Sequence, residues 1–241
     1  MTPRDTPRPT ARMLRPPTAL ELALESEEAC GPVALPRLPG GLTLHVRQEG
    51  TAGTGGSLWP SASVVCRWLS RRPSEVEGKA VLDLGCGTGA VGLYAAGLGA
   101  RRTLLTDGCE SVLANAQANI ELNRSSLGAA NVSTRQLKFG GGSDPPTGPW
   151  DLVFASDCVY GDWQPLVQTV RGLLQAQEPP PRVLLAVPHR HPGSVLSEAV
   201  IASSGLRATV LEVDRAPEHP LKTPNEQLLA VSLIELLLAR K

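Results

Sequence analysis

The sequence of 241 residues has no excess of charge of either sign, since 23 basic and 23 acidic side chains cancel. Proteins that bind nucleic acid or an anionic membrane commonly carry a strong basic excess, so we expect neither kind of partner here. Aromatic residues make up only 3% of the chain, with two tyrosines and two phenylalanines. A tyrosine that stands next to an acid is therefore more informative than it would be in an aromatic-rich chain.

Paired cysteine motifs and long apolar runs are also missing. The five cysteines form no C-x-x-C pair: they are Cys30, Cys66, Cys86, Cys109 and Cys158. Isolated cysteines of this kind favour free thiols in a reducing compartment. No apolar run reaches the roughly 18 residues that span a bilayer, and no apolar secretory signal follows Met1. We therefore expect an intracellular protein, in the cytoplasm or the nucleus, with no membrane association.

The first 38 residues are rich in Pro, Arg and Thr and show no hydrophobic periodicity. Such a segment gains little by ordering, so we predict a disordered tail over residues 1–38 and a single folded domain over residues 39–241. Four arginines within the first fifteen residues leave organelle targeting open as an alternative, although several prolines oppose the amphipathic helix of a mitochondrial presequence.

From Lys79 onward, short apolar runs alternate with amphipathic helical stretches, the pattern of a mostly parallel sheet with helices on both faces. The predicted strands are residues 80–84, 103–106, 132–137, 151–156, 183–187, 209–213 and 227–238. The last two have no helix between them and so predict an antiparallel edge pair. The predicted fold is a Rossmann-like α/β domain with a seven-stranded sheet.

The most informative segment is residues 81–89, Val-Leu-Asp-Leu-Gly-Cys-Gly-Thr-Gly, where an apolar strand runs into three glycines and then a helix. A sharp turn whose backbone lies close to a ligand requires residues without a Cβ. The spacing differs from the G-x-G-x-x-G of dinucleotide sites, and Asp83 precedes the first glycine. An acid there can hold the ammonium of an amino-acid ligand but would repel a pyrophosphate, which favours S-adenosylmethionine over NAD.

The next predicted strand ends at Asp107, 20 residues after Gly87. A carboxylate at that place can accept hydrogen bonds from the two ribose hydroxyls of an adenosine. Taken alone, Asp107 could equally cap the helix that follows it. The strand, glycine turn and helix before it favour the ribose.

Four segments together resemble those of the seven-strand class I methyltransferases, and within them the lysine methyltransferase group called family 16. They are residues 56–62 ahead of the first long helix, the turn 83–89, the asparagines at 115, 119 and 123, and residues 157–160, Asp-Cys-Val-Tyr. The resemblance spans about residues 41 to 238. It implies transfer of a methyl group from S-adenosylmethionine to a protein that presents a lysine.

The resemblance also implies a set of cofactor contacts. It places Trp59 in the cofactor cleft, Gly85 and Gly87 against the methionine part and Asp107 on the ribose. Ser156 would lie near the adenine, and Phe139 stands where relatives usually have a tryptophan that closes the adenine pocket; Phe can stack but lacks the indole donor. The residues expected to bind the cofactor are Trp59, Asp83, Gly85, Cys86, Gly87, Gly89, Asp107, Phe139 and Ser156.

Asp157 and Tyr160 are the candidate catalytic residues. Asp157 follows a strand at the edge where such folds bind ligands, and it could orient a lysine amine. Tyr160 could offer a hydroxyl and a ring face to the ammonium group. The alternatives are that Asp157 caps a helix beginning near Asp162 and that Tyr160 is a core aromatic.

We expect no metal. His189 and His191 could lie on one face, but no third ligand at a usual spacing accompanies them. Two other functions remain open. One is methylation of a small molecule or a nucleic-acid base, although base N-methylation usually shows prolines in the segment after the fourth strand, which residues 157–160 lack. The other is an inactive binding module that keeps the same fold.

Overall fold

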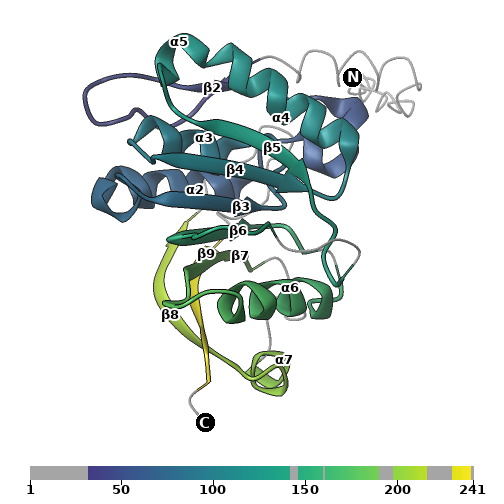
Figure 1. Ribbon diagram of the computed structural model, residues 1–241. Helices are drawn as coiled ribbons and strands as arrows, with labels where there is room; N and C mark the ends of the chain where they lie inside the picture. Colours follow the sequence, from purple (N-terminus) through teal and green to yellow (C-terminus); the bar gives the residue numbers. More distant parts are fainter. Residues whose placement is uncertain (1–31, 142–145, 160, 190–197, 216–229, 240–241) are drawn as a thin grey trace, which may run out of the picture.

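The structure is a computed structural model of the chain (Figure 1). It describes residues 32–141, 146–159, 161–189, 198–215 and 230–239. Most of the predicted tail and the side chain of Tyr160 therefore lie outside the described residues.

The predicted seven-stranded sheet is confirmed. Its strands in chain order are β3 (Ala80–Leu84), β4 (Arg102–Asp107), β5 (Val132–Gln136), β6 (Leu152–Ser156), β7 (Arg182–Pro188), β8 (Leu206–Arg215) and β9 (Ala230–Leu238). Their spatial order is β5-β4-β3-β6-β7-β9-β8, in which β5, β4, β3, β6 and β7 run parallel. The last strand, β9, lies between β7 and β8 and is antiparallel to both. This is the Rossmann-like α/β fold with an antiparallel pair at one edge.

Helices cover both faces of the sheet (Figure 1). They are α2 (Pro60–Ser70), α3 (Ala90–Gly97), α4 (Glu110–Leu122), α5 (Arg124–Leu127), α6 (Gln164–Gln175) and α7 (Glu198–Ser203). Successive strand residues point to opposite faces, so Val81 packs with α2, α3 and α4 while Leu82 packs with α6 in a second core. Among the described residues, no helix combines the length and apolar character needed to cross a membrane.

The folded domain begins before residue 39, so the predicted boundary is wrong. β1 (Val33–Ala34) pairs antiparallel with β2 (His45–Val46). Leu35 and Leu38 are 3% and 4% exposed and belong to the core on the α3 side. Prolines interrupt this stretch, so its apolar residues lack the regular spacing that predicts a strand or a helix.

Three asparagines spaced four residues apart, Asn115 and Asn119 on α4 and Asn123 at its C-cap, attach the segment after β1 to the rest of the domain. Asn119 accepts the N–H of Arg47 at 2.7 Å and donates to the carbonyls of Arg47 and Thr88 at 3.1 and 2.9 Å. Asn123 accepts the N–H of His45 at 2.9 Å and donates to its carbonyl at 2.6 Å. The side-chain amides thus serve the backbone of residues 45–47 as a neighbouring strand would.

We expect Asn119→Ala to lower the free energy of unfolding by about 1 to 3 kcal/mol, because the N–H of Arg47 loses its acceptor and the carbonyl of the buried Thr88 loses its donor. Urea unfolding measures this. Gln117→Ala, on the exposed face of the same helix, is the control and should change stability by less than about 0.5 kcal/mol. Equal stability of the two variants would show that the asparagine does not hold the segment.

Candidate active site

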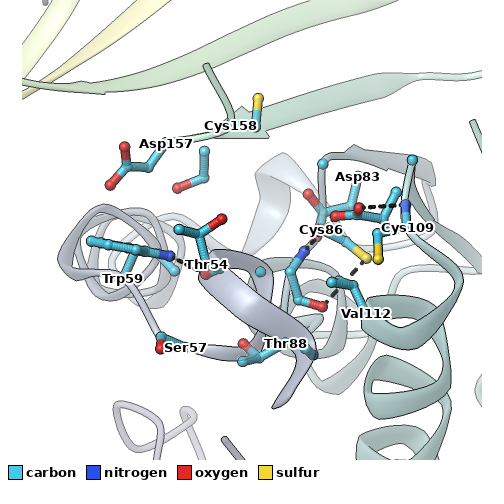
Figure 2. A pocket seen from close by; sticks show the side chains of 18 of the residues that line it. Thr54, Ser57, Trp59, Asp83, Cys86, Thr88, Cys109, Val112, Asp157 and Cys158 are labelled. Atoms are coloured by element: carbon cyan, nitrogen blue, oxygen red, sulfur yellow. Dashed lines mark hydrogen bonds between the residues drawn. The ribbon is translucent and has the colours of Figure 1, made fainter. Parts of the chain in front are cut away.

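A cleft of about 400 Å³ lies at the carboxyl ends of β3, β4 and β6 (Figure 2). Its volume is in the range of small-molecule sites. The walls come from the turn after β3, the loops after β4, β5 and β6, the start of α2, and a 3-10 segment, Gly50–Gly56, that precedes this helix. Every residue that we predicted to bind the cofactor lines this cleft except Gly89.

The glycine turn needs glycine for two different reasons. Gly85 and Gly87 have φ of 62° and 55° and line the cleft. A Cβ on Gly87 would lie 3.2 Å from the carbonyl oxygen of Gly55 across the cleft. Gly89 also has positive φ, but a Cβ there would lie 2.9 Å from Leu105 in the core. The first two glycines therefore shape the cleft, and the third allows α3 to pack closely on the sheet.

Asp83 lies beneath this turn and is 1% exposed. Its Oδ2 accepts the N–H of Gly92 at 3.0 Å, which joins the end of β3 to α3. Burial raises the pKa of Asp83 to about 7, the Gly92 hydrogen bond opposes this rise, and the charge of Asp107 adds to it. The cleft thus contains a carboxyl group that keeps its proton to a much higher pH than an ordinary aspartate does.

Asp107 ends β4 and fixes two elements at once. One carboxylate oxygen accepts the N–H of Gly87 at 3.3 Å, and the other accepts the N–H of Cys109 at 3.1 Å. Asp107 therefore fixes the loop residue that precedes α4 and lines the cleft beside the glycine turn. It does not cap the helix, because the N-cap of α4 is Cys109 and, among the described residues, no side chain caps its first turn.

Trp59 and the 3-10 segment form the lid of the cleft. The indole Nε1 of Trp59 donates to the carbonyl of Thr54 at 2.8 Å (Figure 2). The segment is closed by a hydrogen bond from the N–H of Glu49 to the carbonyl of Gly56 at 2.9 Å. It packs on α4, where a Cβ on Gly55 would lie 2.6 Å from Val112.

The sequence did not predict these lid residues as part of the site. Thr54, Gly55 and Ser57 line the cleft, as do Cys109 and Val112 at the start of α4. The glycine-rich stretch before Trp59 indicated only a loop. Its signal, small residues that admit close backbone approach, resembles that of many surface loops.

Phe139, Ser156 and Cys158 line the wall opposite the lid. The hydroxyl oxygen of Ser156 is buried and has no hydrogen-bond partner among the described residues. Buried hydroxyls usually have a partner, so this atom is suited to a ligand that enters the cleft. Burial raises the pKa of the Cys158 thiol, which leaves it protonated at neutral pH and unsuited to attack as a thiolate.

Asp157 follows β6 and reaches the same cleft. It is 6% exposed, and its φ of 52° is the only positive value for a non-glycine residue in the described part of the chain. Its N–H donates to the carbonyl of Ala186 at 3.0 Å, and its Oδ2 accepts the hydroxyl of Ser61 at 3.5 Å. The capping alternative is not supported, because the first N–H of α6, that of Gln164, is accepted by Asp162 at 2.9 Å.

The structure describes only one of the two histidines that we considered as a metal pair. His189 shares a hydrogen bond of 2.7 Å with Ser232, while His191 lies outside the described residues. Within the described ranges, no three potential metal-ligating side chains cluster.

The charged side chains that line the cleft are all acidic. Among the described residues its lining includes three aspartates, Asp83, Asp107 and Asp157, and no lysine, arginine or histidine. Such a lining favours cationic groups and disfavours phosphate.

Comparison with known proteins agrees with this geometry. A family model described as lysine methyltransferase matches residues 40–195. The chain is 36% identical over 130 residues to protein N-lysine methyltransferase METTL21A of Danio rerio, which covers 52% of this chain and 55% of that protein. It is 32% identical over 141 residues to EEF1A lysine methyltransferase 3 of Xenopus tropicalis, with 57% and 61% covered. The chain spans about half the length of the curated relatives it matches.

Solved structures share the fold. The magnesium protoporphyrin IX methyltransferase of Synechocystis PCC 6803, solved with bound SAH, is 14% identical with a TM-score of 0.52, and the match covers 73% of this chain and 81% of that chain. At this identity the likeness concerns the fold alone. The family model, by contrast, matches more than half of the chain and confirms the resemblance found in the sequence. The chain belongs to the lysine methyltransferase family.

Proposed function

We propose that this protein is an S-adenosylmethionine-dependent protein-lysine N-methyltransferase. The observation that carries the proposal is the buried Asp157 carboxylate, which reaches the same cleft as the glycine turn and Asp107. Membership of the lysine methyltransferase family supports it, as do relatives whose names assign them protein-lysine methylation. We expect the protein in the cytoplasm or the nucleus.

The cleft fits S-adenosylmethionine by shape and by donor set. Gly85 and Gly87 line the cleft, and we assign the space beside the turn to the methionine part. A Cβ on Gly85 would lie 2.5 Å from the Cβ of Cys158, and one on Gly87 would narrow the gap to Gly55. We assign Asp107 to the ribose hydroxyls and the buried, partnerless hydroxyl of Ser156 to the adenine, as the resemblance implies. Phe139 supplies a ring face for stacking.

Gly87→Ala should weaken S-adenosylmethionine binding more than tenfold, because a Cβ would enter the space between the turn and Gly55. Calorimetric titration measures the affinity, and NAD should give no heat. Gly128→Ala is the matched control: Gly128 has φ of 58°, its Cβ would meet nothing within 4 Å, and it does not line the cleft. Both variants put alanine at a positive φ, so equal affinities would place the cofactor elsewhere.

The burial of Asp83 lowers the stability of the folded protein, but its carboxyl group can interact favourably with a cationic ligand. A carboxyl group whose pKa is raised by burial destabilises the folded protein once pH favours its ionised form. A cationic ammonium beside it would stabilise that ionised form. We assign Asp83 to the amino group of the methionine part, in addition to its hydrogen bond with Gly92.

Asp83→Asn should separate these two effects. The unfolded chain loses the Asp83 proton near pH 3.8 and the folded protein near pH 7, so wild-type stability relative to the variant should fall as pH rises through this range. Asparagine still accepts the Gly92 N–H. Chemical denaturation at pH 5 and pH 8 should therefore show the variant gaining relative stability at pH 8, while its cofactor affinity drops. A pH-independent difference would show that Asp83 is ionised throughout.

When bound, S-adenosylmethionine supplies an electrophilic methyl group on a positively charged sulfur. The lysine ammonium would first lose a proton to water, and the neutral amine would then take the methyl group in line with the departing sulfur, which keeps the electron pair of the broken bond. The protein must therefore hold the nucleophile in line and exclude water. We assign Asp157 to binding and orienting the amine, and Tyr160 to a wall of the lysine channel, as the resemblance implies.

The negative lining favours a lysine acceptor over a nucleic-acid base. A lysine ammonium that enters beside Asp157 meets an opposite charge, whereas the phosphates that flank a base would approach the carboxylates of Asp107 and Asp157. Small-molecule methylation has no comparable observation in its favour.

Asp157→Asn should reduce methyl transfer about 100-fold or more while cofactor affinity stays unchanged, because the charge acts on the acceptor. Asparagine suits this test, since it tolerates positive φ, whereas alanine at φ 52° would add backbone strain. Asp157→Gly removes the side chain without that strain and should be equally slow. Wild-type rates in both variants would place the acceptor site elsewhere.

Labelled methyl transfer into a cell extract tests the function itself. The expected result is label in protein that appears as methyllysine after acid hydrolysis. Label confined to nucleic acid or to small molecules would contradict the proposal. Cofactor binding without any transfer would favour the inactive binding module.

A further inference from the structure

Asp157 is held in an unusual backbone conformation at the rim of the cleft. Its φ of 52° is in the left-handed region, and its N–H is bonded to Ala186 of the neighbouring strand. Residues are held in such conformations where the surroundings over-determine them, and these places are frequently functional. The backbone therefore fixes where the side chain starts, and the carboxylate orientation needs a second constraint.

Ser61 supplies a contact of the right kind. It lies in the first turn of α2, is 0% exposed, and its Oγ is 3.5 Å from Oδ2 of Asp157. Ser61 has no helix carbonyl three or four residues before it, unlike Ser70 at the other end of α2, whose hydroxyl donates to the carbonyl of Arg67 at 2.7 Å. The Ser61 hydroxyl donates to a carboxylate 96 residues away in the sequence.

The location of Ser61 limits how it can affect the acceptor site. Ser61 is not among the residues that line the cleft, so its hydroxyl acts on the acceptor site only through Asp157. Figure 2 shows the carboxylate of Asp157 turned toward Trp59, the residue from which α2 starts. The amino end of a helix carries partial positive charge and favours a carboxylate there.

We propose that Ser61 is a positioning residue for methyl transfer, whose hydroxyl fixes the Asp157 carboxylate in the orientation that receives the acceptor ammonium. This inference rests on the acceptor role proposed for Asp157. A carboxylate can accept the Ser61 hydroxyl and a lysine ammonium together, since its two oxygens offer about four acceptor positions. A distance of 3.5 Å is long for such a bond, and catalytic hydrogen bonds often tighten only when the substrate is present.

The test is a double-mutant cycle on the full chain with Ser61→Ala, Asp157→Asn and the combination. Initial rates of labelled methyl transfer from S-adenosylmethionine to protein lysine in a cell extract are measured with calorimetric cofactor affinities. Ser61→Ala should slow transfer by about 10-fold to 100-fold at unchanged cofactor affinity, because the carboxylate loses its alignment. The double variant should be no slower than Asp157→Asn, since the two residues act through one contact.

Two further variants separate positioning from packing. Ser70→Ala lies on the same helix and should transfer methyl groups at the wild-type rate. Ser61→Thr keeps a hydroxyl donor and should restore most of the rate lost in Ser61→Ala. A threonine variant as slow as the alanine variant would assign the loss to packing and overturn the proposal.

The remaining outcomes distinguish this inference from the proposed function. A wild-type rate in Ser61→Ala together with a slow Asp157→Asn overturns the positioning role alone. Losses that multiply in the double variant also overturn it, because they show independent effects. A wild-type rate in Asp157→Asn overturns the acceptor assignment first and the role of Ser61 with it.

Discussion

The Asp107 carboxylate is the contact on which the geometry of the cleft depends. One oxygen binds the N–H of Gly87 and the other that of Cys109, so a single side chain sets the separation between the turn after β3 and the start of α4. The parallel pairing of β3 with β4 brings both groups to one edge of the sheet. The lid then rests on both elements, with the Gly55 carbonyl beside Gly87 and the Gly55 backbone against Val112.

The lid has no strand to hold it, and α4 takes that role. The asparagine amides of this helix satisfy both backbone groups of His45 and of Arg47, just before the 3-10 segment begins. Asn119 also binds the carbonyl of Thr88 inside the glycine turn. Asn119 thus connects the segment that leads into the lid to the glycine turn. The position of the lid therefore depends on α4, the helix whose start Asp107 holds.

Patterns in the sequence predict the sheet, the helices and the glycine turn because each has a local cause: alternating or continuous apolar runs, helical spacing, and residues without a Cβ. The order of the last strands is different. β9 follows β8 in the chain but lies between β7 and β8 in the sheet, because it pairs with β7. No local pattern encodes this long-range pairing. The lid and the ordered stretch at Leu35 and Leu38 were missed for a related reason, since glycines and prolines hide segments whose order comes from long-range contacts. Gly89 shows the converse limit, because spacing alone does not tell a ligand-facing glycine from one that faces the core.

The clustering of three aspartates in the lining of the cleft has a physical consequence. The charge of Asp107 contributes to the raised pKa of Asp83, so the two groups disfavour each other's ionised form. A ligand that carries positive charge relieves this repulsion as it binds, and binding to the folded state alone stabilises the fold. Asp157 adds a third negative group at the place where we propose that the acceptor enters. The same electrostatic cost therefore favours a cationic cofactor and a cationic acceptor over neutral or anionic ones.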